Sequence, residues 1–546
     1  MVMKFKLLLF INLLLFVNQQ AYPKKFINNI FIEKKNVFDS TQSDWFFASE
    51  FANSLHYLTR DYVIEDELLF FEGDTLNKDK IYETVRNLRN TGFFTDVAAR
   101  LDSLDDRYYD VYLTTQDRWS TLPIFIFGTG GNTTSIGGGI EELNLLGTGT
   151  HIRMESYHRS ENQIGWQGGL FLTQRRLLRS DFYFDFGITA NEYRTDQSIV
   201  FGEPFRNIEA PWSYGISAIN SYGRDFLYKK IEGVTTNEAS VNYELMPFHN
   251  RDVYLWLSRS WLKNDRVFAS FLLQANDVNR GRAEFERAFD NSGKLLVSFS
   301  SVAENYFQTS MLNTYQKEDV PIGGWGAATL GKIFPIGSQG KAFYYIAGQG
   351  EKSYLFDKLY FFGQVTGASA FSHGFGYYTY EEFLGKAFYR FSKNLLIASR
   401  IRQQTVWNWS KLRQLILDND GGLRGYEANK LAGDNRFVVN TELRAFPEWQ
   451  FWIVKLSGVL FWDFGTVWEQ NTKLFKTQWH NSAGFGLRFF NTKATGDDSI
   501  FRLDFAFNFD ERKFGAIIFT TDQLFSVFER HRYKIPQVYG TEFDYE

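Results

Sequence analysis

The stretch FRLDFAFNFD, residues 501–510, decides the fold class of this chain. Its odd-numbered positions are large and apolar: Phe501, Leu503, Phe505, Phe507 and Phe509. Its even-numbered positions are small, polar or charged: Arg502, Asp504, Ala506, Asn508 and Asp510. Successive side chains of a β-strand point to opposite faces. A soluble sandwich can alternate as well, but an apolar face opposite both signs of charge is typical of a strand between lipid and a wet lumen.

The alternation continues through residues 121–528, where no helical stripe of comparable length stands out. At roughly 25 residues for each strand and its connection, this length accommodates about sixteen antiparallel strands. The sheet must close on itself, because lipid cannot satisfy the backbone groups of an open edge. We therefore expect a membrane β-barrel of about sixteen strands over residues 121–528, followed by a C-terminal tail at residues 529–546.

The composition of the chain favours a barrel over a helical membrane protein. The 546 residues include 18% aromatic residues and 44 Gly against 9 Pro, and the mean hydropathy is -0.30. This balance suits many strands with tight turns and aromatic belts at membrane interfaces. Cysteine is absent, which excludes disulfides, thiolate metal sites and a lipidated N-terminal Cys. The net charge of -4 gives no electrostatic case for nucleic acid.

Residues 1–21 have the layout of a secretory signal peptide. Lys4 and Lys6 precede an apolar run at residues 7–17, and a polar segment leads to Ala21. The run is shorter than the roughly 20 residues that a membrane-spanning helix needs. A buried N-terminal helix is the alternative, but two lysines before a leucine-rich run have no reason to open a soluble fold. Gln19 stands where a small residue is preferred, so the cleavage point stays open.

Residues 22–120 mix helical and extended patterns, unlike the rest of the chain. A short extended stretch at residues 26–32 is followed by a helix predicted over residues 44–58, because Phe47, Phe51, Leu55 and Leu58 share one face. A second helix is predicted over residues 79–88, with Ile81, Val85 and Leu88 on one stripe. Two alternating strands follow at residues 93–101 and 109–115. The sequence therefore predicts a small α+β domain ahead of the barrel.

Short motifs occur in a specific order within this domain. NSLHYLTR (residues 53–60), VIEDELLF (63–70), EGD (72–74), VRNLR (85–89) and GFF (92–94) are followed by DRWS (117–120) directly before the barrel. In this order they resemble a POTRA domain of the BamA/TamA outer-membrane assembly superfamily, the bacterial surface antigen family. The resemblance implies a periplasmic domain that captures extended client proteins. The alternative is any other small α+β domain, since fold-level likeness alone is weak evidence.

Three motifs in the barrel segment extend the resemblance. ELNLLGTG (142–149) resembles the superfamily's turn after the second strand. LRGY (423–426) resembles a motif on a long loop that folds back into the lumen, and FWDFG (461–465) resembles its partner motif on the thirteenth strand. The loop motif consists of Leu423, Arg424, Gly425 and Tyr426. The resemblance implies that Arg424 pairs with Asp463.

The residues support this pairing independently. Alternation over residues 454–465 places Asp463 on the polar face with Lys455 and Ser457, where an unpaired charge would be costly once dehydrated. The planar fork of an arginine can hold a carboxylate through two hydrogen bonds. Gly425 allows a backbone conformation that other residues resist. The alternative is that Arg424 is a solvated loop charge.

Two further groups of residues are candidates for the function. Asn440, Glu442 and Arg444 alternate inward on the strand after the loop, and we interpret them as the bed of the loop, although a generic polar lumen would look the same. Glycine weakens strand pairing, so Gly128 and Gly130 in the first strand and Gly515 in the last strand, predicted at residues 513–525, mark a lateral seam. Two features depart from the superfamily: a single POTRA unit and a polar tail after the last strand.

No catalytic, cofactor or metal site is expected. The seven His are dispersed, no His-Glu-x-x-His or P-loop pattern occurs, and His480 and Ser482 face the lumen, away from lipid substrate. We expect a non-enzymatic factor for outer-membrane protein assembly, insertion or translocation; the alternatives are a passive porin or solute channel and a structural surface barrel. Its expected place is the outer membrane of a Gram-negative-type cell, with the POTRA-like domain in the periplasm. Expected partners are outer-membrane lipids and unfolded or extended client proteins, with periplasmic or lipoprotein partners left open and nucleic acid excluded.

Overall fold

The chain forms two compact units in the computed structural model, Met1–Asp117 and Arg118–Glu546. The structure describes residues 24–38, 50–51, 53–54, 56–130, 133–160, 164–207, 209–229, 242–262, 265–282, 287–315, 317–337, 340–409, 415–419, 421–427, 430–493, 500–520, 524–526 and 533–541. The predicted signal peptide at residues 1–21 and much of the helix predicted at residues 44–58 lie outside the described residues.

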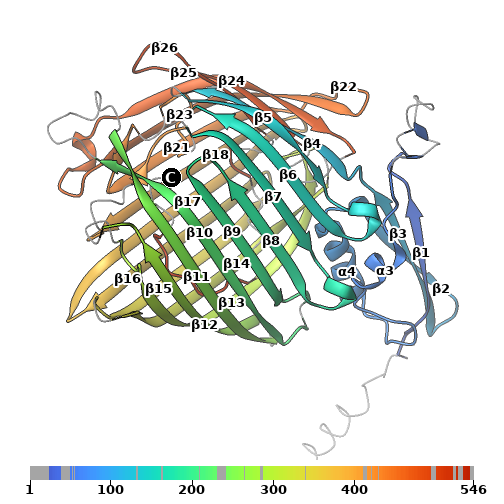
Figure 1. Ribbon diagram of the computed structural model, residues 1–546. Helices are drawn as coiled ribbons and strands as arrows, with labels where there is room; N and C mark the ends of the chain where they lie inside the picture. Colours follow the sequence, from blue (N-terminus) through green and yellow to red (C-terminus); the bar gives the residue numbers. More distant parts are fainter. Residues whose placement is uncertain are drawn as a thin grey trace, which may run out of the picture. The chain divides into compact units, whose positions relative to one another are not determined.

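The first unit is a three-stranded sheet with helices (Figure 1). Its elements are β1 (Phe26–Lys35), α3 (Asp61–Glu65), α4 (Lys78–Asn90), β2 (Phe94–Ser103) and β3 (Tyr108–Asp117). The sheet order is β1-β3-β2, with β1 parallel and β2 antiparallel to β3. The helix predicted at residues 79–88 and the strands predicted at residues 93–101 and 109–115 are therefore confirmed.

Capping and apolar packing explain where α4 begins and which face it buries. The side chain of Asn77 accepts hydrogen bonds from the backbone N–H groups of the first turn, which satisfies donors that have no partner inside a helix. Val85 and Leu88 then pack against Val97 of β2 and Leu113 of β3. Among the described residues, no helix is both long and apolar enough to cross a lipid bilayer.

The second unit is a closed antiparallel β-barrel, with 20 strands in the described residues (Figure 1). Its strands are β4 (Thr121–Gly130), β5 (Thr133–Glu142), β6 (Thr150–Arg159), β7 (Gly165–Gln174), β8 (Tyr183–Ala190), β9 (Arg194–Glu203), β10 (Trp212–Lys229), β11 (Asn242–Leu262), β12 (Arg266–Asn279), β13 (Ser292–Ser310), β14 (Lys317–Pro335), β15 (Phe343–Phe356), β16 (Leu359–Ser372), β17 (Phe375–Ser392), β18 (Leu395–Trp407), β21 (Asn435–Ala445), β23 (Val454–Trp468), β24 (His480–Asn491), β25 (Ile500–Asn508) and β26 (Lys513–Thr520). Short elements lie in the connections: β19 (Leu415–Ile416), β20 (Ala432–Gly433), β22 (Gln450–Phe451) and the 3-10 turns η1 (Leu145–Gly147), η3 (Leu177–Arg179) and η5 (Leu474–Lys476).

The expected number of about sixteen strands is wrong. Several connections are only two residues long, so each strand with its connection uses fewer residues than assumed; Asp357 and Lys358 join β15 to β16, and His373 and Gly374 join β16 to β17. Asp357 and His373 have positive φ, as two-residue hairpin turns require. The FWDFG motif consequently lies on β23, the seventeenth strand of this barrel rather than the thirteenth.

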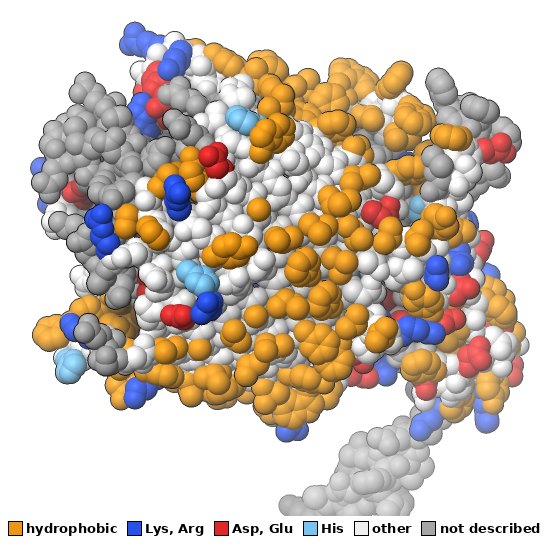
Figure 2. Space-filling model, in the orientation of Figure 1, with side chains coloured by type: hydrophobic (Ala, Val, Ile, Leu, Met, Phe, Trp, Pro, Cys, Tyr) orange, Lys and Arg blue, Asp and Glu red, His pale blue; other side chains and the backbone are white. Residues whose placement is uncertain are grey.

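Side chains alternate between a lipid face and a lumen face, which confirms the prediction from residues 501–510. In β25 the lumen-facing residues are buried: Arg502, Asp504, Ala506 and Asn508. The opposite face carries Phe507, which is 40% exposed. Figure 2 shows hydrophobic side chains spread over the barrel strands on the face in view. An apolar exterior around a buried polar interior is the pattern of a membrane-spanning barrel.

The barrel closes between its last and first strands. β26 pairs with β4 only through residues 516–519 and 127–130. The strand predicted at residues 513–525 is too long, because β26 ends at Thr520. Phe525 is buried in the lumen instead, where its carbonyl oxygen accepts a hydrogen bond from Arg444 Nη2 (2.9 Å). The chain leaves the ladder because lumen side chains of other strands bind its backbone.

Candidate functional site

The loop between β18 and β21 carries the LRGY motif into the barrel. β19 and β20 pair with each other within this loop. Leu423 is fully buried among Leu417, Leu431 and Val438. Gly422 and Gly425 have φ angles of +107° and +87°, a conformation that costs glycine little. The positive-φ conformations at Gly422 and Gly425 and the apolar contacts of Leu423 together fix the position of Arg424.

The guanidinium group of Arg424 binds the carboxylate of Asp463 through two hydrogen bonds. Nε donates to Asp463 Oδ2 at 2.7 Å, and Nη2 donates to Asp463 Oδ1 at 2.8 Å. Both side chains are completely buried. This two-pronged geometry is the strongest arrangement between an arginine and a carboxylate, and it connects the loop to β23.

The remaining amino group of Arg424 reaches two more carboxylates. Nη1 donates at 3.0 Å to Glu442 Oε1 on β21 and at 3.0 Å to Asp504 Oδ2 on β25. Glu442 also accepts from Arg444 Nε (2.9 Å), and Asp504 also accepts from Arg488 Nη1 on β24 (2.5 Å). Three buried arginines thus face three buried carboxylates, and Arg424 of the loop bonds directly to three strands, β21, β23 and β25.

The electrostatic balance of this network makes each buried charge depend on its partners. Removing an ion from water costs several kcal/mol, and its partners offset that cost only while they are all in place. The guanidinium carbon of Arg424 also lies 3.5 Å from the ring centroid of Phe461, a cation–π contact in a desolvated setting. The loop is therefore held in one position by charge pairing rather than by apolar area alone.

Asn440 completes the bed of the loop. Its Nδ2 donates to the backbone oxygen of Gly422 at 2.6 Å and to Asp463 Oδ1 at 2.7 Å. Its Oδ1 accepts from Arg400 Nη2 at 2.7 Å. One fully buried amide therefore orients both the loop backbone and the carboxylate that Arg424 binds.

The same loop lies against the last strand of the barrel. A Cβ atom at Gly515 would lie 2.5 Å from the carbonyl oxygen of Gly425, so only glycine fits at this contact. Gly515 sits at an irregularity of β26, where the register with β25 shifts between Ala506 and Phe507. Asn508 of β25 adds a hydrogen bond to the Gly425 oxygen (3.3 Å). The loop thus contacts the strand that closes the barrel.

The structure brings most of the predicted site residues into one cluster. They are Leu423, Arg424, Gly425, Tyr426, Asn440, Glu442, Arg444, Asp463 and Gly515. The Tyr426 hydroxyl donates to the backbone oxygen of Asn481 at 2.9 Å. Gly128 and Gly130 lie in a different place, opposite Ile518 and Ala516 in the pairing of β4 with β26. Their role in a seam stays a prediction.

Sequence reasoning missed several members of the network: Asp504, Arg488, Phe461 and Arg400. Alternation does place Asp504 and Arg488 on the lumen face, so a signal for their direction existed. Their place in the network depends on where the loop between β18 and β21 lies against the neighbouring strands β23, β24 and β25, which no local pattern encodes. In the described ranges, no group of three or more His, Cys, Asp or Glu side chains is placed to hold a metal ion.

A comparison with protein families bears on the first unit. The family model "POTRA: Surface antigen variable number repeat" matches residues 51–116. Residues 51–116 form a POTRA domain. The POTRA match includes α3, α4 and β2, whereas β1 precedes the matched residues. No curated protein sequence matches the chain.

Comparison with solved structures returns matches of low identity and low TM-score. BamA from Haemophilus ducreyi lacking POTRA domains 1-3 has 12% identity and a TM-score of 0.38, covering 91% of this chain and 83% of that chain. CdiB from Acinetobacter baumannii has 11% identity and a TM-score of 0.44, covering 90% and 73%. The siderophore receptor PirA from Pseudomonas aeruginosa has 9% identity and a TM-score of 0.40, covering 75% and 80%. Identities of 9–12% carry no functional assignment for this chain.

Proposed function

We propose that this protein assembles, inserts or translocates outer-membrane proteins, without enzymatic chemistry, in the outer membrane of a Gram-negative-type cell. One observation carries the proposal: the loop that Arg424 anchors lies with its Gly425 backbone against Gly515 of β26. Among the pairings of neighbouring strands in the 20 described barrel strands, that of β26 with β4 is the shortest. The anchored loop is therefore placed to control the junction where this barrel opens most easily.

The β26–β4 junction has the physical features of a seam. Backbone hydrogen bonds and cross-strand side-chain pairs stabilise neighbouring strands, and here the ladder spans residues 516–519 and 127–130 only. Gly128 and Gly130 contribute no side chain to it. An edge opened in lipid leaves backbone groups unsatisfied, so an arriving client strand that pairs with the edge stabilises the open form.

The POTRA domain supports the proposal because it offers strand edges of its own. β1 and β2 are the two outer strands of its sheet, and an extended client segment can add to such an edge through main-chain hydrogen bonds. With this domain in the periplasm, clients would be captured there and passed to the barrel seam. The expected partners are unfolded or extended client proteins and outer-membrane lipids, together with periplasmic or lipoprotein partners.

A passive channel is the second candidate, favoured by a polar cavity in the barrel. The cavity has a volume of about 270 Å³. Its lining includes Arg194, Asp225, Arg280 and Asp290. Paired charges of both signs along a wet cavity are also what a solute pathway needs.

Insertion of a client barrel into liposomes tests the proposal against this alternative. Liposomes with the reconstituted protein should accelerate insertion of an unfolded outer-membrane barrel over empty liposomes, measured by heat-modifiable migration of the client. Liposomes with the Arg424→Ala variant should lose most of that acceleration, because the loop is no longer anchored beside β26. Equal insertion rates with and without the protein, combined with ion conductance, would favour the channel.

A further inference from the structure

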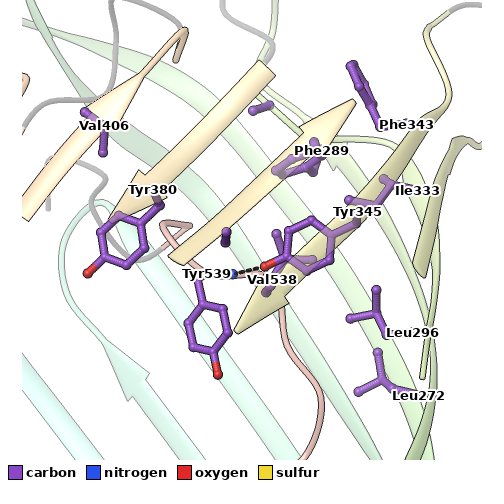
Figure 3. Packing of buried hydrophobic residues seen from close by; sticks show 14 of the residues in the cluster. Leu272, Phe289, Leu296, Ile333, Phe343, Tyr345, Tyr380, Val406, Val538 and Tyr539 are labelled. Carbon is purple, nitrogen blue, oxygen red and sulfur yellow. Dashed lines mark hydrogen bonds between the residues drawn. The ribbon is translucent and has the colours of Figure 1, made fainter. Parts of the chain in front are cut away.

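The lumen wall of the barrel contains an apolar patch that the proposed function does not explain. Its members lie on neighbouring strands (Figure 3) and include Leu272, Leu296, Ile333, Phe343, Tyr345, Ala347, Ala368, Ala370 and Tyr380. On β15 they alternate with the exposed residues Tyr344 and Ile346, so they face the lumen and not the lipid. Apolar side chains in a wet lumen are unfavourable unless something covers them.

The C-terminal tail covers this patch. Val538 and Tyr539 are each 8% exposed and belong to the same apolar cluster, and Ile535 packs against it. Figure 3 shows Tyr539 beside Tyr345, with Leu272 and Leu296 on the adjoining wall. The apolar patch of the lumen wall is therefore covered by residues 533–541 of the same chain.

Polar contacts give the tail a defined register along the wall. The backbone N–H of Tyr539 donates to the Tyr345 hydroxyl at 2.9 Å, and the Tyr539 hydroxyl donates to Gln349 Oε1 at 3.3 Å. Lys534 Nζ donates to the same Gln349 oxygen at 3.0 Å and lies 4.9 Å from the ring centroid of Trp325. Gln349 thus accepts hydrogen bonds from two tail residues, Lys534 and Tyr539, which are five positions apart.

Aromatic rings and a glycine fix the two ends of the docked segment. At one end, the ring of Tyr533 lies 4.8 Å from that of Phe205 and 5.4 Å from that of Phe268, and its hydroxyl bonds to Ser258. At the other end, Gly540 has a φ of +82°, and a Cβ atom there would lie 2.8 Å from Trp409 Cζ2. The wall therefore selects a tyrosine at one end and a Tyr-Gly pair at the other.

We propose that this aromatic lumen wall is a peptide-binding site, and that residues 533–541 are its tethered occupant and close the lumen to ions. The site takes an extended peptide with two tyrosines six positions apart and a glycine after the second. A tethered segment has an effective concentration in the millimolar range, so even a micromolar site is occupied nearly all the time. Closure of the lumen by residues 533–541 is independent of client insertion.

Single-channel conductance in planar bilayers tests this proposal. A chain that ends at residue 526 should conduct at least tenfold more than the full chain. A synthetic peptide of residues 533–541 should block this current, and the same peptide with Gln537→Ala should block equally, because Gln537 is exposed. Peptides with Tyr539→Ala or Gly540→Val should block at least tenfold more weakly. Unchanged conductance after truncation, or equal block by all four peptides, would overturn the proposal.

Full-length variants keep the test decisive if the shortened chain does not fold. Tyr539→Ala and Gly540→Val each weaken docking while the rest of the chain is intact, and both should raise the open probability at least tenfold. Gln537→Ala is the matched control and should behave as the unchanged protein. Heat-modifiable migration shows whether each barrel is folded. Folded variants with unchanged open probability would contradict the proposal that residues 533–541 close the lumen.

Discussion

Replacing Arg424 by Ala removes the one side chain that bonds to three carboxylates of the lumen network. After the change, Asp463 keeps its hydrogen bond from Asn440, Glu442 keeps Arg444, and Asp504 keeps Arg488. The strands retain their backbone ladders, so the barrel should remain folded. The loop, in contrast, loses its link to β21, β23 and β25 at once.

The size of the effect follows from burial. Removing one partner of a buried ion pair costs about 3–5 kcal/mol, because the remaining charge stays buried without full compensation. At about 1.4 kcal/mol for each factor of ten, the released form of the loop should become roughly a hundredfold to several thousandfold more populated. Arg402 offers a matched control: it pairs with Glu382 in the lumen but is 31% exposed, so Arg402→Ala should cost about 1 kcal/mol or less.

Limited proteolysis of the reconstituted protein measures this release. Proteinase K is suitable, because trypsin would lose a cleavage site in the Arg424→Ala variant. Cleavage at residues 422–430 should accelerate at least a hundredfold, since its rate follows the population of the open form when reclosing is fast. Arg402→Ala should change it little. A rate within twofold of the unchanged protein for Arg424→Ala would refute the role of the network as the anchor of the loop.

Two further predictions follow from the contacts of the loop, and a third follows from the barrel. Asp463→Ala should release the loop as Arg424→Ala does, and the double variant should be no worse than the worse single variant because both remove one shared contact; strictly additive proteolysis rates would show that the two residues act independently. Gly515→Val should also release the loop, because a Cβ there meets the Gly425 oxygen at 2.5 Å, whereas Gly458→Val should not, because a Cβ there meets nothing within 4 Å; equal proteolysis of both would contradict the contact. The protein should fractionate with the outer membrane and migrate faster on gels before boiling than after it, and recovery as a soluble periplasmic protein would contradict the barrel.

Local patterns in the sequence predict the surroundings of each barrel residue well. Period-two alternation identified the lipid and lumen sides of residues 501–510 and the inward direction of Asp463. Alternation is informative because one face of each strand contacts hydrocarbon and the other faces the lumen. The first face therefore needs apolar side chains, and the second carries polar ones. The order of motifs also located the POTRA domain.

Quantities that depend on distant parts of the chain were not predictable in the same way. The predicted number of strands is wrong because it depends on the lengths of the connections. Two-residue turns such as Asp357 with Lys358 are too short to stand out in the composition of the sequence. The predicted start of the last strand at Lys513 is correct, but its predicted end at Phe525 is wrong because Phe525 binds Arg444, a partner 81 residues away in sequence. The tail beyond it looks polar in sequence, yet Val538 and Tyr539 find a matching apolar wall formed by several strands.

A disulfide across the β26–β4 junction shows whether this seam has to open for client insertion. Thr129 and Ile517 are direct partners in the pairing of β4 with β26, so their Cα atoms lie close enough for a disulfide. Thr129→Cys with Ile517→Cys therefore locks the seam, while Thr129→Cys with Thr134→Cys places the crosslink inside the β4–β5 hairpin as a matched control. The chain has no other Cys. The oxidised seam variant should lose client insertion into liposomes and regain it on reduction, with the control active throughout; full insertion by the locked barrel would show that the seam does not need to open.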